Sequence, residues 1–228
     1  MPKSRNYRYY DLAVAASVAT LIISNLGATK LIAFGPIIAD GGGVLFPLAY
    51  ILGDVMTEVY GYKHTRRAIW VSFFWLLVMI VVLTIVRFLP AADAATNVEA
   101  FDQIFGFVPR IVAASLVAYL AGEFMNSFVL AKMKVQSGGK HLWQRLIGST
   151  IVGESVDTTI FGLIAFGGIL STHDMFIFIL VGVIFKTVVE TLMLPITYWI
   201  IAWLKKRENE DYYDKKTNFT PLSVSLDD

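Results

Sequence analysis

Long apolar segments dominate this chain and limit it to folds that cross a membrane. A helix needs roughly 20 apolar residues to cross the hydrocarbon core of a bilayer. Six segments qualify, with boundaries near residues 11–34, 44–62, 67–89, 109–131, 146–170 and 175–204. The 228 residues are 56% hydrophobic, a larger share than in an ordinary soluble domain. The sequence therefore predicts an all-α integral membrane protein with six transmembrane helices.

Lysine and arginine are distributed unevenly between the predicted connections. They occur in the N-terminal tail (residues 1–10), in the second and fourth connections and in the C-terminal tail (residues 205–228), whereas the other three connections contain none. Cytoplasmic loops carry an excess of basic residues, so both termini are predicted to be cytoplasmic, on either side of a transmembrane domain formed by residues 11–204. The short C-terminal tail has mixed charge and is predicted to be disordered.

The two halves of the chain repeat similar residues at a steady offset. Asn126 follows Asn25 by 101 residues, and Glu154 follows Asp54 by 100. Chance can also align such residues, but the steady offset favours a duplication. Each half would hold three spans, so the halves would cross the membrane in opposite directions. Such 3+3 inverted repeats occur in secondary transporters, whose substrate sites lie near the midplane at the repeat interface.

Ionisable side chains lie inside several of the predicted spans. A charge at the bilayer centre costs at least about 2.5 to 3.5 kcal/mol on insertion scales, so such residues rarely lack a partner or a function. The polar residues in question are Asp54, Glu58, Glu123, Asn126, Glu154, Asp157, Lys186 and Glu190. We expect them to line one polar cavity. Lys186 and Glu190, four residues apart, could instead form an internal ion pair, and Glu123 with Asn126 could simply join two helices.

Two predicted helix faces combine carboxylates with an aromatic ring. At 3.6 residues per turn, one face presents Tyr50, Asp54 and Glu58, and the other presents Glu154, Asp157 and Phe161. A carboxylate can accept two parallel N–H bonds, and a ring can stack on a heterocycle. These faces predict a binding site for a flat heterocycle that donates hydrogen bonds.

Four sequence blocks follow one another between about residues 25 and 203: FPLAYILGDVMTEVYGYKHTRR, RIVAASLVAYLAGEFMNSFV, GESVDTTIFGLIAF and KTVVETLMLPITYW. Together they resemble the queuosine precursor transporter family, which is also grouped with vitamin uptake transporters. The resemblance implies a multi-pass protein of the bacterial inner membrane. Such a protein imports 7-deazaguanine bases such as 7-cyano-7-deazaguanine, or queuine, for salvage into transfer RNA. The positions that carry over are Asp54, Arg110, Ser115, Asp157, Phe161 and Lys186.

A 7-deazaguanine presents a ring N–H and an amino group on one edge, which suits a carboxylate that accepts two hydrogen bonds. Asp54 or Asp157 could take this role, with Tyr50 or Phe161 stacked on the ring. By hypothesis, Asn25 and Asn126 read the carbonyl and the remaining polar edge.

Several of the remaining polar residues have structural interpretations. Arg110 lies near the outer end of its span, where it could reach the headgroups or help to close the outer mouth together with Ser115. Lys186 and Glu190 are assigned structural or gating roles beside the substrate. No metal site or cofactor is expected, because His173 and Asp174 are too sparse a set and the chain contains no cysteine.

Three classes of function compete at this level. A self-contained secondary transporter is favoured, with its carboxylates carrying a proton, holding sodium or only binding substrate. The alternative is a substrate-binding subunit that depends on a separate energy-coupling ATPase module and docks through the small residues Ala15 and Ala19. An enzyme is disfavoured because no nucleophile and base accompany the carboxylates. No basic stripe suits nucleic acid, and small-residue faces permit a homodimer.

Overall fold

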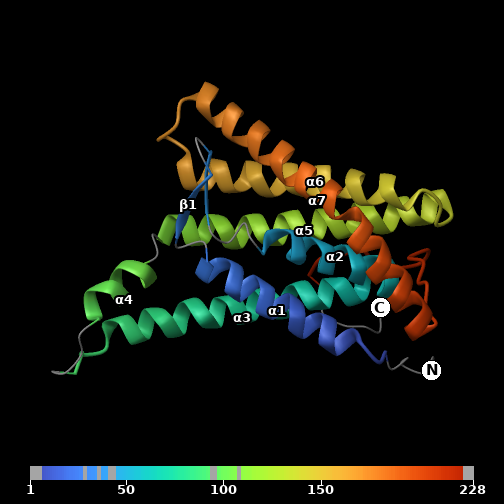
Figure 1. Ribbon diagram of the computed structural model, residues 1–228, viewed down its shortest axis with the longest axis horizontal. Coiled ribbons are helices and arrows are strands. Elements are labelled where there is room, and N and C mark those ends of the chain that lie inside the picture. The colour runs from blue at the N-terminus through green and yellow to red at the C-terminus, as the bar shows by residue number, and fades with distance from the viewer. Residues whose placement is uncertain are drawn as a thin grey trace.

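The computed structural model describes residues 7–27, 30–34, 37–40, 45–92, 97–106 and 109–222. They form the helices α1 (Tyr10–Gly27), α2 (Phe46–Tyr60), α3 (Tyr62–Phe88), α4 (Val98–Phe105), α5 (Pro109–Ser137), α6 (Leu142–Phe166) and α7 (Thr172–Glu208), and the strands β1 (Leu31–Phe34) and β2 (Ile37–Asp40). In Figure 1, α3, α5 and α6 run roughly along the longest axis, and α7 crosses obliquely.

Five helices in the described part of the chain are long and apolar enough to cross a membrane. They are α1, α3, α6, α7 and residues Val112–Ser137 of α5. Their outer faces expose large apolar side chains, including Phe74 and Ile85 on α3 and Val181, Ile184 and Leu192 on α7. A surface of this kind is unfavourable in water but compatible with lipid. The protein is therefore a multi-pass integral membrane protein, as the sequence predicted.

The strands β1 and β2 lie where the sequence predicted the end of the first span and an outer connection. Helix α1 ends at Gly27, and the strands pair antiparallel with Leu31 opposite Asp40 and Phe34 opposite Ile37. The all-α fold class holds for the seven helices, and these two short strands are the exception in the described chain. A glycine and a proline stand between the strands in the sequence. Proline has no N–H for a helix, and isoleucine and phenylalanine favour extended backbone.

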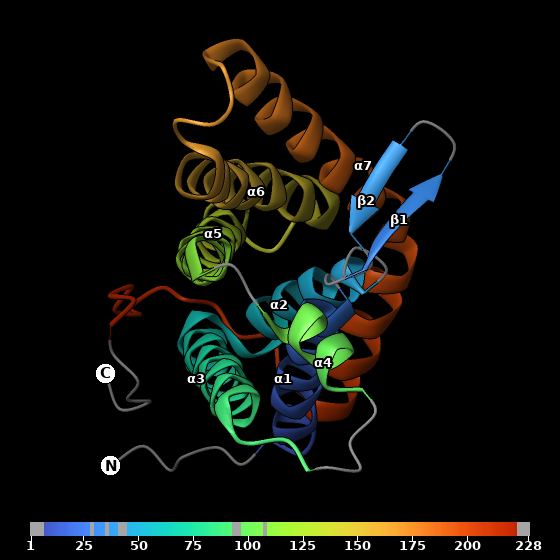
Figure 2. The ribbon, with the colours of Figure 1, turned by 90° about the vertical axis from the view of Figure 1, so that its left-hand side faces the viewer.

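Helix α2 occupies the centre of the protein. It contacts α1, α3, α5 and α7, and Figure 2 shows it enclosed between these helices. All of its residues from Gly53 to Tyr60 are buried. With 15 residues it is about 22 Å long, shorter than the hydrocarbon core of roughly 30 Å. This helix lies where the second span was predicted, but it is too short to cross the hydrocarbon core by itself.

Two glycines let α5 and α6 approach closely. A Cβ atom at Gly153 would lie 2.7 Å from the Cβ of Asn126, and a Cβ at Gly122 would lie 2.7 Å from that of Asp157. Any side chain at either position would force the helices apart. The glycines thereby bring the polar residues of α5 next to those of α6.

The start of α1 and the end of α7 lie together at one end of the protein (Figure 1). The backbone N–H groups of Arg8 and Tyr9 donate to the carboxylate of Glu208 at 2.9 and 2.7 Å. The tyrosine ring of Tyr9 also packs on Trp203 of α7. The two ends of the described chain are thus on the same side of the bundle.

Residues 209–222, which we call the C-terminal strap, pack against this same end. Asp214 accepts hydrogen bonds from the backbone N–H of Tyr62, and Arg66 donates to the carbonyls of Asn218 and Thr220 at 3.0 and 2.7 Å. The ring of Phe219 contacts that of Tyr62. The prediction of a disordered tail does not hold for these residues, because buried groups of α3 find their partners in the strap.

Candidate functional site

Lys186 of α7 lies between two carboxylates of α6. Its Nζ is 2.6 Å from Oε2 of Glu154 and 2.7 Å from Oδ2 of Asp157. The Glu154 side chain is fully buried, whereas 22% of the Lys186 side chain and 19% of the Asp157 side chain remain accessible. One ammonium group therefore serves two carboxylates, and Lys186 with Asp157 forms the accessible edge of the group.

Asp54 of α2 joins the same group from the opposite side. Asn126 of α5 donates from Nδ2 to Oδ1 of Asp54 at 2.9 Å. Asp54 also shares a hydrogen bond with Glu190 of α7, which in turn accepts one from the hydroxyl of Thr150 on α6. Two carboxyl groups can hydrogen-bond each other only when one of them holds a proton. Asp54 and Glu190 are therefore placed so that they could share a proton.

Tyr50 and Glu123 complete the polar group. The buried phenol of Tyr50 on α2 contacts the carboxylate of Glu154. Glu123 of α5 comes close to α2 because position 53 is glycine: a Cβ there would lie 3.0 Å from Oε2 of Glu123. Helices α2, α5, α6 and α7 thus all contribute to one intramembrane cluster.

This cluster, which we call the carboxyl cluster, holds many acids and little positive charge. Its acidic members are Asp54, Glu123, Glu154, Asp157 and Glu190, and Lys186 supplies positive charge among them. Carboxylates that share a low-dielectric site cannot all ionise, because like charges repel and burial disfavours charge. Such a cluster can hold protons and bind hydrogen-bond donors, and it suits a bare anion poorly.

Glu58 lies outside the carboxyl cluster, in the last turn of α2, where three cations surround it. Its carboxylate is 2.7 Å from Nη1 of Arg145, 2.7 Å from Nζ of Lys205 and 3.4 Å from Nζ of Lys134. The side chain is fully buried. In this structure Glu58 joins α2 to α5, α6 and α7.

Asp211 of the C-terminal strap extends this network. It lies 2.5 Å from Lys134 and 2.8 Å from Lys205. Partial burial would raise the pKa of Asp211, but hydrogen bonds and the charges of Lys134 and Lys205 outweigh it and hold the pKa below its ordinary value. We call this set, Glu58, Lys134, Arg145, Lys205 and Asp211, the Glu58 network.

Sequence reasoning treated Lys134, Arg145 and Lys205 only as basic residues near cytoplasmic connections. The structure places Lys134 and Arg145 inside the protein, 1% and 2% exposed. The available signal was their position on the terminal turns of long helices rather than in loops, together with the buried Glu58, which requires a cation.

For three other predicted site residues, the structure describes no contact with the carboxyl cluster. Asn25 donates to the Leu21 carbonyl of its own helix at 2.9 Å. Arg110 donates to the carbonyls of Ile164 and Gly167 at 2.5 Å each, so it caps the end of α6. Ser115 is half-buried on α5.

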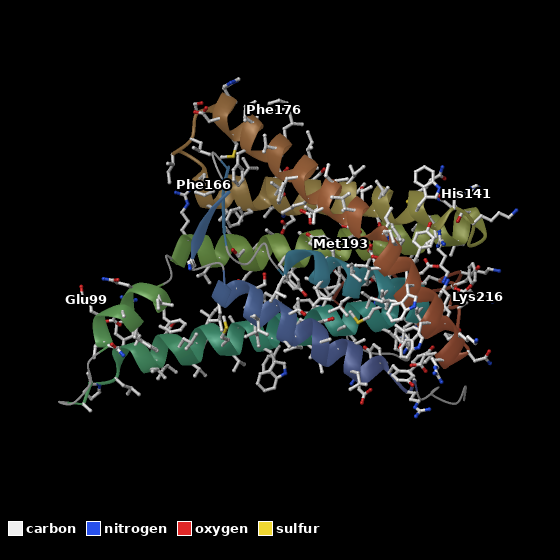
Figure 3. All side chains as sticks on the ribbon, in the orientation of Figure 1. Glu99, His141, Phe166, Phe176, Met193 and Lys216 are labelled. Atoms are coloured by element: carbon white, nitrogen blue, oxygen red, sulfur yellow. The ribbon has the colours of Figure 1, made fainter. Side chains whose placement is uncertain are left out.

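Phe161 follows Asp157 by one turn on α6 and belongs to an aromatic group. Its ring centroid is 5.8 Å from that of Phe166 and 6.4 Å from that of Phe178. Figure 3 places Phe166 and Phe176 at the end of the bundle opposite His141 and Lys216. Phe161 therefore lies between the carboxyl cluster and the end of the protein remote from the strap. The structure brings together Tyr50, Asp54, Asn126, Glu154, Asp157, Lys186 and Glu190, and their roles toward a substrate stay predictions.

A polar cluster enclosed by several membrane-crossing helices is typical of membrane transporters. A family model described as "Putative vitamin uptake transporter" matches residues 40–200. The chain belongs to this family, whose members are transporters and not enzymes.

Three curated relatives carry names that specify a cargo. The chain is 30% identical over 179 residues to a "Probable queuosine precursor transporter" of Bacillus subtilis, covering 78% of each chain. It is 26% identical to the "Queuosine precursor transporter" of Escherichia coli, covering 73% of this chain and 74% of that one. A "Probable queuosine precursor transporter" of Haemophilus influenzae is 26% identical, with 64% and 59% covered. No solved structure matches the chain.

Proposed function

We propose that this protein imports queuosine precursors, 7-deazaguanine bases such as 7-cyano-7-deazaguanine, across the bacterial inner membrane. The names of the three relatives support this cargo class. The observation that carries the proposal is the accessible pair of Lys186 and Asp157, whose Nζ and Oδ2 are 2.7 Å apart.

The polar edge of a 7-deazaguanine complements this pair. The edge presents a carbonyl oxygen, a ring N–H and an exocyclic amino group in a row. Lys186 can donate to the carbonyl, while the Asp157 carboxylate accepts from the N–H and the amino group. This assignment replaces the sequence-based hypothesis for Asn25 and Asn126, whose amides donate to Leu21 and Asp54.

The substituent at position 7 lies on the five-membered ring, away from that edge. Recognition through Lys186 and Asp157 therefore admits cyano, aminomethyl and larger substituents alike. Phe161 lies one turn beyond Asp157 on α6, where its ring can stack on the base, and Tyr50 offers a second ring from α2.

The proposal includes six passes through the membrane, with α2 as the second, and a 3+3 inverted repeat whose halves rock around the site. The meeting of α1 and α7 at one end, through Arg8 and Glu208, is consistent with an even number of passes. Basic residues at this end favour the cytoplasmic side.

The proposal is tested with radiolabelled 7-cyano-7-deazaguanine and proteoliposomes that contain only the purified protein. We expect saturable uptake by the wild type and its loss in Asp157→Asn, because an amide presents one acceptor where the base needs two. Asp102→Asn is the matched control, since Asp102 forms an exposed ion pair with Arg87 on α3. Such exposed pairs contribute little.

Each outcome has a distinct meaning. Equal uptake by Asp157→Asn and the wild type would reject the proposed binding edge. Binding without uptake, restored by an added ATPase module, would identify the energy-coupled subunit instead. The exposed small residues Ala15 and Ala19 of α1 would then be the first surface to test.

A further inference from the structure

A cavity lies on the side of α2 that faces α1 and α3. Its polar lining comes from Ser17 of α1, Ser72 of α3 and Tyr119 and Glu123 of α5, with Gly53 and Met56 of α2 forming a wall. The carboxyl cluster is built from α2, α5, α6 and α7. Glu123 therefore belongs to both places, because it lines the cavity and faces the acids of α6 and α7.

Glu123 is buried beside this cavity. Only 6% of the residue is exposed, and within the described part of the chain no hydrogen bond or ion pair reaches its carboxyl group. Tyr119 and Ser72 line the same cavity beside it. A carboxyl group in this setting is not compensated by any cation of its own.

The groups that face Glu123 are mainly acids. Glu154 and Asp157 face it from α6 and Glu190 from α7, while Asp54 and Tyr50 face it from α2. Lys186 is held by Glu154 and Asp157 at 2.6 and 2.7 Å. Ionisation of Glu123 would therefore remove its hydration and place it among groups that repel it.

We propose that Glu123 is a proton-binding site that couples transport of the base to the proton gradient, with the α1–α2–α3–α5 cavity as its route to water. The cargo in this statement rests on the proposed function. A conformation that admits water to the cavity, or moves the acids of α6 and α7 away, lets the proton leave. Because the base is neutral, the binding of one proton per cycle makes each import step carry one positive charge inward.

The first test compares the wild type, Glu123→Gln and Glu99→Gln in proteoliposomes with labelled 7-cyano-7-deazaguanine. Glutamine imitates the protonated acid, so we expect Glu123→Gln to exchange internal for external base while losing accumulation driven by an inward proton gradient. Glu99 is the control because it is exposed on α4, at the opposite end from Lys216 (Figure 3). Glu99→Gln should accumulate base like the wild type. Accumulation by Glu123→Gln, or a wild type driven by sodium and indifferent to pH, would overturn the proposal.

A second readout is independent of the cargo. Infrared difference spectra of the wild type between acidic and alkaline pH should contain the carbonyl stretch of a protonated carboxylic acid. The contribution of Glu123 to this band should be lost in Glu123→Gln, so the band should weaken there and keep its full intensity in Glu99→Gln. If the wild type moves no deazaguanine but the band weakens as expected, the proposed function fails and the proton site stands. A band of unchanged intensity in folded Glu123→Gln would refute the site itself.

Discussion

Gly122 of α5 and Gly153 of α6 pack backbone against backbone, with the carbonyl oxygen of Gly122 only 3.0 Å from where a Cβ of Gly153 would lie. Each glycine directly precedes a glutamate of the carboxyl cluster, Glu123 or Glu154. The close crossing therefore sets the distance between the acids of α5 and those of α6. The packing of these two glycines is a condition for the site.

Gly153→Ala should destabilise the protein and impair uptake. The new methyl group would lie 2.7 Å from the Cβ of Asn126, and overpacking of this kind costs roughly 1–3 kcal/mol. Thermal unfolding in detergent measures the effect. Gly148→Ala on the same helix is the control, because its nearest atom, 3.2 Å away, is the flexible end of Met133. Equal unfolding temperatures for both variants would contradict the proposed role of the crossing.

Glu58→Gln should destabilise the end of the bundle against which the C-terminal strap packs. The substitution leaves Lys134, Arg145 and Lys205 with Asp211 as their acid in the Glu58 network. Breaking a buried ion pair from one side costs about 3–5 kcal/mol. The expected result is a clearly lower unfolding temperature than that of the exposed control Glu99→Gln. If uptake is lost while stability is unchanged, Glu58 acts on substrate, as the sequence first suggested.

Lys186→Gln should abolish uptake and lower stability, because Glu154 and Asp157 lose their shared cation. The double variant Lys186→Gln/Asp157→Asn removes one charge of each sign. We expect it to recover much of the stability but none of the uptake, since the recognition edge is gone. Unfolding temperature and vesicle uptake are measured side by side. Recovery of both would assign the pair a purely structural role.

Deletion of residues 209–228 should destabilise the protein by exposing Tyr62 and leaving the buried Arg66 without its carbonyl partners. An unsatisfied buried polar group costs about 1–3 kcal/mol, and more when it is charged. Deletion of residues 223–228 alone preserves these partners and serves as the control. Identical unfolding curves for the two truncations would show that the strap contributes nothing.

Asp211 should make stability sensitive to acid. Partial burial opposes ionisation, but the hydrogen bonds and charges of Lys134 and Lys205 lower its pKa below the ordinary value of 3.8. A depressed folded-state pKa gives stability that is present above about pH 4 and is lost as the pH falls through the folded-state value. Wild type should therefore lose more stability than Asp211→Asn between about pH 5 and pH 3. Parallel curves for the two proteins would count against this linkage.

The positions of the long helices followed closely from the lengths of the apolar segments. The predicted fourth span began at residue 109, as α5 does, and the predicted second span, residues 44–62, contains α2 (Phe46–Tyr60). The short helix α4 (Val98–Phe105) was not predicted, because eight residues are too few for a periodic pattern. The strands β1 and β2 were missed because their apolar residues resemble a continuation of the first span.

The sequence predicted which residues belong to the polar cluster better than it predicted which of them contact one another. Asp54, Asn126, Glu154 and Asp157 were all identified, since any polar residue inside an apolar span is conspicuous. The sequence suggested an ion pair between Lys186 and Glu190 on the same helix. In the structure Lys186 lies between two acids of α6. Residues four apart are visible in a sequence, whereas partners on another helix depend on how closely the two helices cross.

By itself, the sequence determined that this protein crosses a membrane with several helices, which residues are polar within them, and which family the chain belongs to. These properties follow from local composition and from matching residues in order. Only the tertiary structure decided that α2 is enclosed by four helices, that Glu58 binds three cations and that no cation of the described residues pairs with Glu123. Such pairings arise from contacts between segments far apart in the chain, where glycine crossings and the packed strap select one partner among several charges.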